Sequence, residues 1–393
     1  MSGALEGIRV LDLTSYIAGP FATMLLGDLG AEIIKIEQPG AGDMFRAWDK
    51  EPELYSPLFR SFNRNKKSLT LNLRSPEGKE IFFQLARKAD VVVENFRPGV
   101  VNRLGIDYAA ITQANPRIIY CSISAFGQSG PYKAKPGYDT IGQALSGLLS
   151  ILTDLKDPTG PGAPFSDHLG GIYGCYGILA ALMARERTGK GQKVETSLLE
   201  ATISFIGYSV TQYLASGRVP TMISRLHEAQ VYAFVAQDGL PFVIHLSHPM
   251  KFWEGLTGAI GRKDLRDDPR FKDGHAREQN YDQLRDIFKE VFRQNTRDHW
   301  LRTLEQHDVP CAPIRKMDEV FEDPQVRFLD RLVEIHDPEL GSSHFVKNGV
   351  NLSETPASIS TRPPKLGENN LEILTVLGYN EQDIATLSAK GII

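Results

Sequence analysis

Short apolar segments alternate with segments of helical periodicity over the first 125 residues. The segments IRVLDL, EIIKIE, SLTLNL, DVVVENF and RIIYCSIS are rich in β-branched residues and predict strands at 8–13, 32–37, 68–73, 90–96 and 117–124. Helical spacing of apolar residues is found between them, at 21–30, 77–89 and 107–115. Strands this apolar, separated by helices, predict an α/β fold with an open parallel sheet and helices on both faces.

The pattern changes after about residue 215. QVYAFVAQDGLPFVIHL, at 230–246, predicts a hairpin around Asp238 and Gly239, and charged helices are expected between about 250 and 307. A short β stretch near 331–350, a Pro-rich linker at 355–367 and one amphipathic helix at 371–391 follow. The hairpin at 230–246 and the helices to about 307 predict a separate, smaller α/β domain.

The glycine-rich motifs that bind nucleotide phosphates are missing from the strand-to-helix turns. Glu37, at the end of the second strand, resembles the ribose-binding acid of a dinucleotide site. That site also needs G-x-G-x-x-G in the first turn, where TSYIAGP offers only Gly19. TGKGQ at 188–192 fails as a P-loop, because Ala184 occupies the position of the first glycine. Neither NAD nor ATP is therefore expected in its usual cradle.

The composition is that of an ordinary globular protein and argues against several classes of partner and site. The 393 residues are 41% hydrophobic and 23% charged, with a net charge of -4, and no basic run interleaved with aromatic residues suggests a nucleic-acid partner. No signal peptide or membrane span is recognisable. Cys121, Cys175 and Cys311 are too scattered for a disulfide framework or a zinc site. We expect a cytoplasmic protein with no metal and no membrane or nucleic-acid partner.

One acidic residue stands out in the middle of the chain. The Pro/Gly-rich loop at 153–167 leads to Asp167, a lone carboxylate at the head of a small, apolar helix. Asp167 is a candidate helix N-cap and a candidate nucleophile, and the two roles do not exclude each other. Gly171, Gly174 and Gly177 recur every third residue along that helix, which predicts either tight helix packing or close approach of a ligand or a partner backbone.

Ordered motifs along nearly the whole chain resemble those of the class III coenzyme A transferases, of the CaiB/BaiF type. They include LDLTSYIAGPFATMLLGDLGAEIIKIEQPGAGD, NKKSLTLNL, ADVVVENFRPGVVNRLG, ISAFGQSGPYKAKPGYD and RERTGKGQKVETSLLEA. This is the family of formyl-CoA transferase and carnitine CoA-transferase, and α-methylacyl-CoA racemases share its fold. The resemblance implies a large CoA-binding domain at 1–210, a small domain at 226–325, and a linker with a C-terminal segment at 326–393 that returns to the large domain. It also implies an interlocked homodimer.

The resemblance also implies a covalent mechanism at Asp167. Its carboxylate attacks the donor thioester to give a mixed anhydride, and the released CoA thiolate then attacks the aspartyl carbonyl to give an aspartyl-CoA thioester. A free carboxylic acid reverses these steps. Acyl-CoA is then a substrate, and no prosthetic group is required. The helix N-terminus would keep Asp167 ionised. Intramolecular CoA transfer between the two carboxyls of one dicarboxylate uses the same chemistry.

The same resemblance implies a set of coenzyme A contacts. These residues are Tyr16, Ile17, Ala18, Gln38, Leu71, Arg74, Asn95, Phe96, Arg103, Leu104, Lys135 and Tyr138. Two of them depart from the family pattern: Ile17 stands where formyl-CoA transferase has a Gln that orients the acyl group, and Gln38 replaces an Arg.

A racemase is the main alternative, because it shares the fold. Racemases pair a His in the motif that reads PGYD here with an Asp near position 167, and Tyr138 stands in place of that His. A phenol with its ordinary pKa near 10 is a poor base at neutral pH, so a transferase is favoured. A protein that only bound CoA would be expected to lack Asp167.

The acceptor-binding residues are less specified by the sequence. His245 and His248 have an H-x-x-H spacing, but no third ligand accompanies them, so we expect no metal there. One of these histidines, or Arg46 or Arg225, is expected to meet the acceptor carboxylate.

Overall fold

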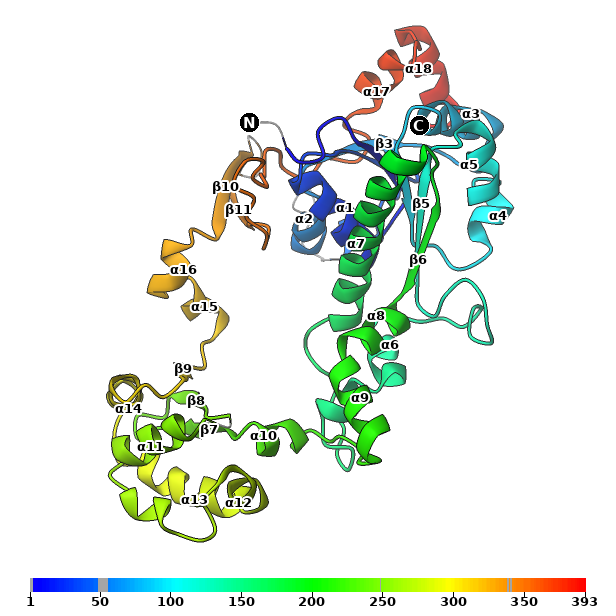
Figure 1. Ribbon diagram of the computed structural model, residues 1–393. Helices are drawn as coiled ribbons and strands as arrows, with labels where there is room; N and C mark the ends of the chain where they lie inside the picture. Colours follow the sequence, from blue (N-terminus) through cyan, green and yellow to red (C-terminus); the bar gives the residue numbers. More distant parts are fainter. Residues whose placement is uncertain (1–2, 49–55, 248, 338, 340) are drawn as a thin grey trace. The chain divides into compact units, whose positions relative to one another are not determined.

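The computed structural model describes residues 3–48, 56–247, 249–337, 339 and 341–393 (Figure 1). The chain forms two compact units. The large unit contains Met1–Leu149, Gly160–Val210 and Arg331–Ile393, and the small unit contains Ser150–Thr159 and Thr211–Asp330. The large unit is therefore assembled from both ends of the chain.

Six parallel strands form the sheet of the large unit, in the order β3-β2-β1-β4-β5-β6. The strands are β1 (Arg9–Asp12), β2 (Glu32–Glu37), β3 (Lys66–Thr70), β4 (Val91–Glu94), β5 (Ile119–Ser124) and β6 (Lys193–Ser197). The chain winds outward in opposite directions from β1 and β4, which are neighbours. In open sheets of this kind, ligands bind beyond the carboxyl ends of the strands at such a switch point.

Helices cover both faces of this sheet, as the sequence predicts. Successive strand residues point to opposite faces, so Val10 and Leu11 enter two different hydrophobic cores. The core with Val10 is closed by α1 (Ala18–Asp28) and α7 (Phe165–Thr188). The core with Leu11 is closed by helices from both ends of the chain: α3 (Pro76–Ala86), α4 (Val100–Leu104), α5 (Tyr108–Ala114), α17 (Asn370–Val376) and α18 (Glu381–Ala389).

The glycines of α7 serve helix packing. A Cβ atom at Gly171 would lie 2.7 Å from the carbonyl oxygen of Ala18, and one at Gly174 would lie 2.8 Å from Cδ1 of Ile123. At Gly177, the Cβ would lie 2.6 Å from a Val194 methyl carbon. The packing interpretation is therefore confirmed, because these glycines bring α7 against α1, β5 and β6 rather than against open space.

Further elements belong to the large unit or, at residues 149–151 and 207–216, run from it into the small unit. They are η1 (Met44–Ala47), α2 (Pro57–Asn63), α6 (Asp139–Ser146), η2 (Leu149–Ile151), α8 (Leu198–Phe205), α9 (Gly207–Ser216), β10 (Leu332–Asp337) and β11 (Gly341–Val346). Strands β10 and β11 pair antiparallel, in agreement with the β stretch predicted near 331–350.

The C-terminal segment differs from the prediction in two respects. The stretch at 355–367 is bound to the large unit: the Ser358 N–H donates to the Asp28 carbonyl at 2.8 Å, and the Gly367 N–H to the Ser68 hydroxyl at 2.9 Å. The single helix predicted at 371–391 is wrong, because Gly378 takes a φ of 98° and Asn380 caps a second helix. Helices α17 and α18 result.

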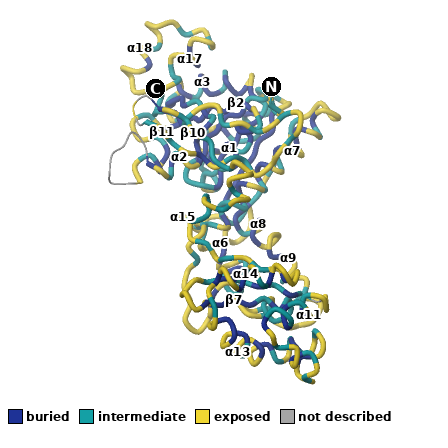
Figure 2. The backbone as a smooth tube through the Cα atoms, turned by 90° about the vertical axis from the view of Figure 1, so that its left-hand side faces the viewer, coloured by how far each residue is buried: buried dark blue, intermediate teal, exposed yellow. Residues whose placement is uncertain are grey.

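The small unit has a three-stranded antiparallel sheet, β7 (Val231–Val235), β8 (Pro241–His245) and β9 (Cys311–Pro313). The predicted hairpin around Asp238 and Gly239 is confirmed. The helices of this part of the chain are α10 (Ser224–Glu228), α11 (Met250–Ala259), η3 (Lys263–Arg266), α12 (Gly274–Gln279), α13 (Tyr281–Phe292), α14 (Arg297–Gln306), α15 (Met317–Val320) and α16 (Pro324–Phe328). Trp253 and Phe288 are buried in their shared core, and Figure 2 shows such buried positions in dark blue.

Within the described ranges, no helix combines the length and the apolarity needed to cross a bilayer. No group of three or more His, Cys, Asp or Glu side chains among the described residues is arranged to hold a metal ion.

Candidate active site

A cavity of about 390 Å³ lies at the carboxyl ends of β1, β4 and β5, beside the switch point of the sheet. Three loops and the first turn of α7 form its walls. It is lined by Ser15, Tyr16, Ile17, Ala18, Met44, Asn95, Phe96, Arg97, Ile123, Ser124, Ala125, Gly137, Tyr138, Asp167 and Leu198. Asp167 is the one carboxylate among these lining residues, all of which the structure describes.

Asp167 lies in the first turn of α7 rather than at its cap. The helix begins at Phe165, the N-cap position is Pro164, and no side chain caps it. The N-cap interpretation of Asp167 is therefore wrong: Phe165 and Ser166 are already helical, so Asp167 is the third residue of the helix, still in its first turn. Its backbone N–H donates to Oδ1 of Asp139 at 3.1 Å, so a second carboxylate satisfies one of the free amides of this helix end.

The surroundings of Asp167 favour the protonated carboxyl. Burial, followed by the charge of Asp139, raises the pKa of Asp167 to about 7. The sequence-based expectation was the opposite, since a helix N-terminus stabilises an anion. Loss of water around the side chain and a like charge nearby oppose this effect. Asp167 therefore titrates in the neutral range rather than near pH 4.

The loop after β1 is fastened to the loop after β4. The Ser15 N–H donates to Oδ1 of Asn95 at 3.0 Å, and Nδ2 of Asn95 donates to the Ser15 carbonyl at 2.8 Å. Tyr16 follows in the left-handed region with a φ of 70°, and its ring lies 5.9 Å from that of Tyr138, centroid to centroid. The two aromatic rings thus form one side of the cavity.

A second cavity, of about 240 Å³, shares Ser15 and Phe96 with the first. Its lining includes four further predicted contacts: Gln38, Leu71, Arg74 and Leu104. Together the two cavities collect every predicted coenzyme A contact except Arg103 and Lys135. Arg103 is exposed on α4, next to Leu104 in sequence, and Lys135 is exposed with its ammonium 3.6 Å from the centre of the Tyr132 ring.

The sequence reasoning missed two polar residues of this site. Arg97 is exposed and is the one cation that lines the first cavity, among residues all described by the structure. Its signal was present, because it directly follows Asn95 and Phe96 at the end of a predicted strand. Asp139, the partner of Asp167, follows Tyr138 in the PGYD motif. It went unnoticed because only the fold brings it to the start of α7.

Arg46 is engaged elsewhere and does not face the cavity as an acceptor-binding residue. Its guanidinium donates to both carboxylate oxygens of Glu37, at 2.6 and 2.8 Å, and lies 3.8 Å from the centre of the Phe59 ring. Both carboxylate oxygens of Glu37 are thereby engaged by Arg46, although Glu37 lines the second cavity. Arg225 and His245 belong to the small unit, and His248 lies outside the described residues.

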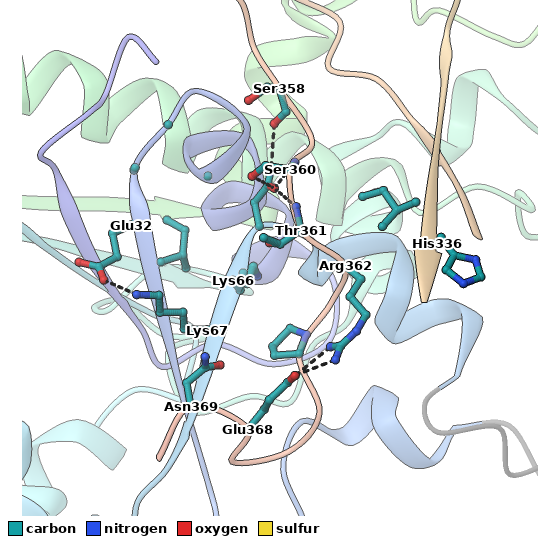
Figure 3. Close-up of a pocket in the computed structure, with 17 residues that line it drawn as sticks. Glu32, Lys66, Lys67, His336, Ser358, Ser360, Thr361, Arg362, Glu368 and Asn369 are labelled. Atoms are coloured by element: carbon teal, nitrogen blue, oxygen red, sulfur yellow. Dashed lines mark hydrogen bonds and ion pairs between the residues drawn. The ribbon is translucent and has the colours of Figure 1, made fainter. Parts of the chain in front are cut away.

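A larger cavity, of about 550 Å³, lies at the opposite, amino-terminal end of β2 and β3 (Figure 3). Four of its charged side chains pair with one another, and Lys66 pairs with Asp12 outside the lining at 3.0 Å. Lys67 meets Glu32 at 2.9 Å, and Arg362 meets Glu368 at 2.7 Å. This cavity therefore offers no unneutralised charge, and it contains none of the predicted site residues.

Comparison with known proteins identifies the family of this chain. The description of the family model that matches residues 5–370 is CoA-transferase family III. The human succinyl-CoA:glutarate CoA-transferase is 36% identical over 99% of this chain and 90% of its own length. The acetyl-CoA:oxalate CoA-transferase of Acetobacter aceti is 40% identical over 93% of this chain and 94% of its own. The crystal structure of a CAIB/BAIF family protein from Brucella suis has a TM-score of 0.84 at 33% identity, and covers 96% of this chain and 100% of that one.

The family model spans nearly the whole chain, and the relatives that match over its length are named as CoA-transferases. The chain belongs to CoA-transferase family III, and it is an enzyme of that kind. The resemblance seen in the sequence motifs is confirmed.

Proposed function

We propose that this enzyme moves coenzyme A from an acyl-CoA thioester to a free carboxylic acid, with Asp167 as the covalent nucleophile. The observation that carries the proposal is the position of Asp167: it is the single carboxylate among the described lining residues of the cavity at the switch point. A carboxylate there can attack a thioester whose pantetheine arm enters between the two clamped loops.

Each step exchanges one acyl bond for another. The Asp167 carboxylate attacks the thioester carbonyl, which forms an anhydride and releases the CoA thiolate. The thiolate attacks the aspartyl carbonyl, which forms an aspartyl-CoA thioester and releases the donor acid. The acceptor carboxylate attacks this thioester, and the returning thiolate then takes the new acyl group and regenerates Asp167. One thioester replaces another overall, so no nucleotide hydrolysis is needed.

The coenzyme is accommodated by the two joined cavities. The first holds the thioester and the pantetheine arm along Tyr16, Ile17 and Asn95. The second is suited to the adenosine part, because apolar Leu71 and Leu104 accompany the guanidinium of Arg74. Arg97 and Arg74 supply cations for the phosphate groups, which guanidinium forks recognise well.

We infer that the acceptor is a small dicarboxylate and that succinyl-CoA is a donor. The human relative carries succinyl-CoA and glutarate in its name, and the Acetobacter aceti relative carries acetyl-CoA and oxalate. A screen of CoA thioester donors against a panel of free acids, read by mass spectrometry, tests this assignment. It also separates intermolecular transfer from transfer within one dicarboxylate, because the latter needs no second acid.

The geometry favours a transferase over a racemase. No histidine is among the described residues that line the cavity. His168, next to Asp167 in sequence, has its ring 4.9 Å from that of Phe21, and its Nδ1 donates to the Pro164 carbonyl at 2.8 Å. Tyr138, which stands in place of the racemase His, lines the cavity.

We also propose that the enzyme is a homodimer. Large apolar side chains are exposed along α7 and α8, among them Tyr176, Met183 and Phe205, which are 66%, 69% and 55% exposed. Extended apolar surfaces of this kind are typical of subunit interfaces. Sedimentation at decreasing concentration tests this, and a folded monomer at low concentration would contradict a dimer that persists until it unfolds.

The covalent mechanism is tested by trapping. Wild-type enzyme incubated with an acyl-CoA and no acceptor should carry CoA as a thioester on the peptide that contains Asp167. Hydroxylamine should convert that side chain to a hydroxamate, and borohydride should reduce it. The absence of both adducts, under conditions in which turnover is demonstrated, would contradict the role of Asp167.

A further inference from the structure

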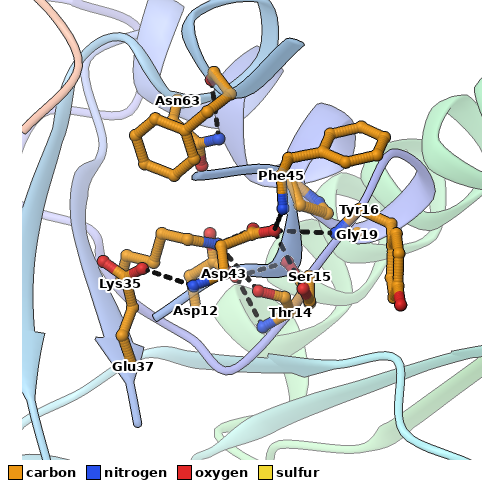
Figure 4. Close-up of polar contacts among 12 residues, drawn as sticks. Asp12, Thr14, Ser15, Tyr16, Gly19, Lys35, Glu37, Asp43, Phe45 and Asn63 are labelled. Carbon is orange, nitrogen blue, oxygen red and sulfur yellow. Dashed lines mark hydrogen bonds and ion pairs between the residues drawn. The ribbon is translucent and has the colours of Figure 1, made fainter. Parts of the chain in front are cut away.

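A pair of fully buried charges lies beneath the loop that carries Tyr16 (Figure 4). Nζ of Lys35, in β2, lies 2.8 Å from Oδ2 of Asp43, and neither side chain has any exposed surface. A second buried pair, Lys66 with Asp12 at 3.0 Å, lies in the same region at the end of β1. Buried ion pairs bring little net stability compared with apolar side chains, so their position calls for another explanation.

The Lys35–Asp43 pair forms hydrogen bonds with the loop after β1, on both sides of Ser15. Nζ of Lys35 donates to the Thr14 carbonyl at 2.7 Å. Oδ1 of Asp43 accepts from the Ser15 hydroxyl at 2.9 Å and from the Tyr16 N–H at 3.2 Å. Hydrogen bonds to charged groups are stronger than neutral ones, so these contacts hold the loop firmly.

These hydrogen bonds stabilise a loop whose backbone conformation is unfavourable. Tyr16 has a φ of 70°, and a residue with a Cβ atom adopts the left-handed region at a cost of about 1–2 kcal/mol. In this conformation its ring packs 5.6 Å from Phe45 and 5.9 Å from Tyr138, centroid to centroid. Oδ1 of Asp43 also accepts from the Phe45 N–H at 3.0 Å, so one oxygen orients two of these three aromatic residues.

We propose that Asp43, held in place by Lys35, is a positioning residue that fixes Tyr16 in its left-handed conformation and so shapes a wall of the cavity that Asp167 also lines. Asp43 does not line that first cavity and acts on it through Ser15 and Tyr16, although it does line the second cavity. The proposal rests on the CoA-transfer function proposed above.

The charge state of the pair agrees with this role. Burial would by itself raise the pKa of Asp43, but the Lys35 ammonium and the hydrogen bonds lower it overall. Burial would lower the pKa of Lys35, and the carboxylates of Asp43, Asp12 and Glu37 raise it overall. Both groups are therefore charged at neutral pH. Because Asp43 alone cannot be neutralised without leaving a buried ammonium unpaired, the test changes both residues.

Two double variants, which remove the contacts of Asp43 to different extents, test the effect on kcat. Lys35→Met with Asp43→Asn removes both charges but leaves a neutral oxygen that accepts from Ser15 and Tyr16, and we expect kcat to fall about tenfold. Lys35→Met with Asp43→Leu removes the acceptor as well, and kcat should fall about a hundredfold or more. In both variants, the Kd for free CoA should change by a smaller factor than kcat, because Arg74 and Leu104, which line the second cavity together with Asp43, are untouched.

The matched control is Arg64→Met with Asp28→Asn, which removes another buried ion pair of the large unit, 2.6 Å long, at the far end of α1. It should lower the melting temperature without changing kcat. If the Asn-containing variant keeps the kcat of this control while the wild type is active, the inference is overturned. If the wild type transfers no CoA between any donor and acceptor, the proposed function fails instead.

Discussion

The backbone N–H of Asp167 donates to the carboxylate of Asp139 across 3.1 Å, so the candidate nucleophile is held by another acid. The other oxygen of Asp139 accepts from Nε2 of Gln143 at 2.5 Å, which fixes the carboxylate in this position. Asp139 thus orders the first turn of α7 and raises the pKa of Asp167 at the same time. Substitution of Asp139 can separate the ordering of the helix from the effect on the pKa of Asp167.

The pH dependence of turnover should report the ionisation of Asp167. Because burial and Asp139 raise its pKa to about 7, a growing share of the enzyme carries the unreactive, protonated carboxyl below this pH. We expect kcat/KM to fall about tenfold per pH unit on the acid side of 7. Initial rates at a fixed donor, from pH 5 to 9, measure this limb. A flat profile down to pH 5 would contradict the shifted pKa.

Asp139→Asn should shift the acid side of the pH profile of kcat/KM to lower pH. The amide oxygen can still accept from the Asp167 N–H, but the like charge is gone, so the pKa of Asp167 should fall while burial still keeps it above its ordinary value. We expect the midpoint of the acid limb to shift down by about one unit or less. A pH profile identical to that of the wild type would show that Asp139 orders the helix without affecting the charge of Asp167.

Asp167→Asn should abolish transfer and leave the fold intact. The anionic nucleophile is lost, so kcat should fall by about three orders of magnitude or more. No cap is lost, because the side chain of Asp167 does not cap α7. Stopped assays with mass detection of acyl-CoA products measure the loss. Activity within about fivefold of the wild type would exclude a nucleophile at this position.

The melting temperature of Asp167→Asn, relative to the wild type, should depend on pH in a defined direction. The pKa of Asp167 is higher in the folded state than in the unfolded state, so wild-type stability is lost as pH rises from about 4 through 7. The Asn side chain does not titrate. The melting temperature of Asp167→Asn should therefore exceed that of the wild type at pH 8, and the difference should shrink as pH falls toward 4.

Gly171→Ala should destabilise the large unit. The added methyl would lie 2.7 Å from a backbone oxygen of α1, which cannot move aside as a side chain can. Overpacking of this kind costs about 1–3 kcal/mol, so the melting temperature should fall by several degrees. Gly207→Ala is the matched control, since nothing lies within 4 Å of its Cβ position. Equal melting temperatures for the two variants would contradict the packing role.

Arg97→Gln and Arg74→Gln should weaken binding of the coenzyme. Each removes a cation from one of the two joined cavities, and a charge-assisted hydrogen bond contributes about 1.5–3 kcal/mol, so KM for the acyl-CoA should rise about tenfold or more. Arg87→Gln serves as a control, because Arg87 is exposed and pairs with Glu80 at 3.5 Å, away from both cavities. A rise in KM for the control as large as that for the two variants would point to general charge rather than specific contacts.

The sequence predicted the sheet well because five of its strands are apolar runs between helices. The sixth, β6, was missed, since Lys193–Ser197 is short and has exposed polar residues at alternate positions. The division of the C-terminal helix was also missed, although Gly378 and Asn380 carried its signals. Asp167 was found by its isolation in an apolar helix, whereas its pKa depends on burial and on Asp139, which lies 28 residues earlier and meets it only in the fold.

The C-terminal segment of the large unit has a consequence for synthesis. Leu374 and Leu387 fill the same core as Phe82, so that face of the sheet stays partly uncovered until the last helices leave the ribosome. The chain must hold an incomplete large unit while the whole small unit is made. Contacts this distant in sequence form slowly, and exposed apolar surface attracts chaperones. Deletion of α17 and α18 would therefore leave the nascent enzyme permanently at that stage.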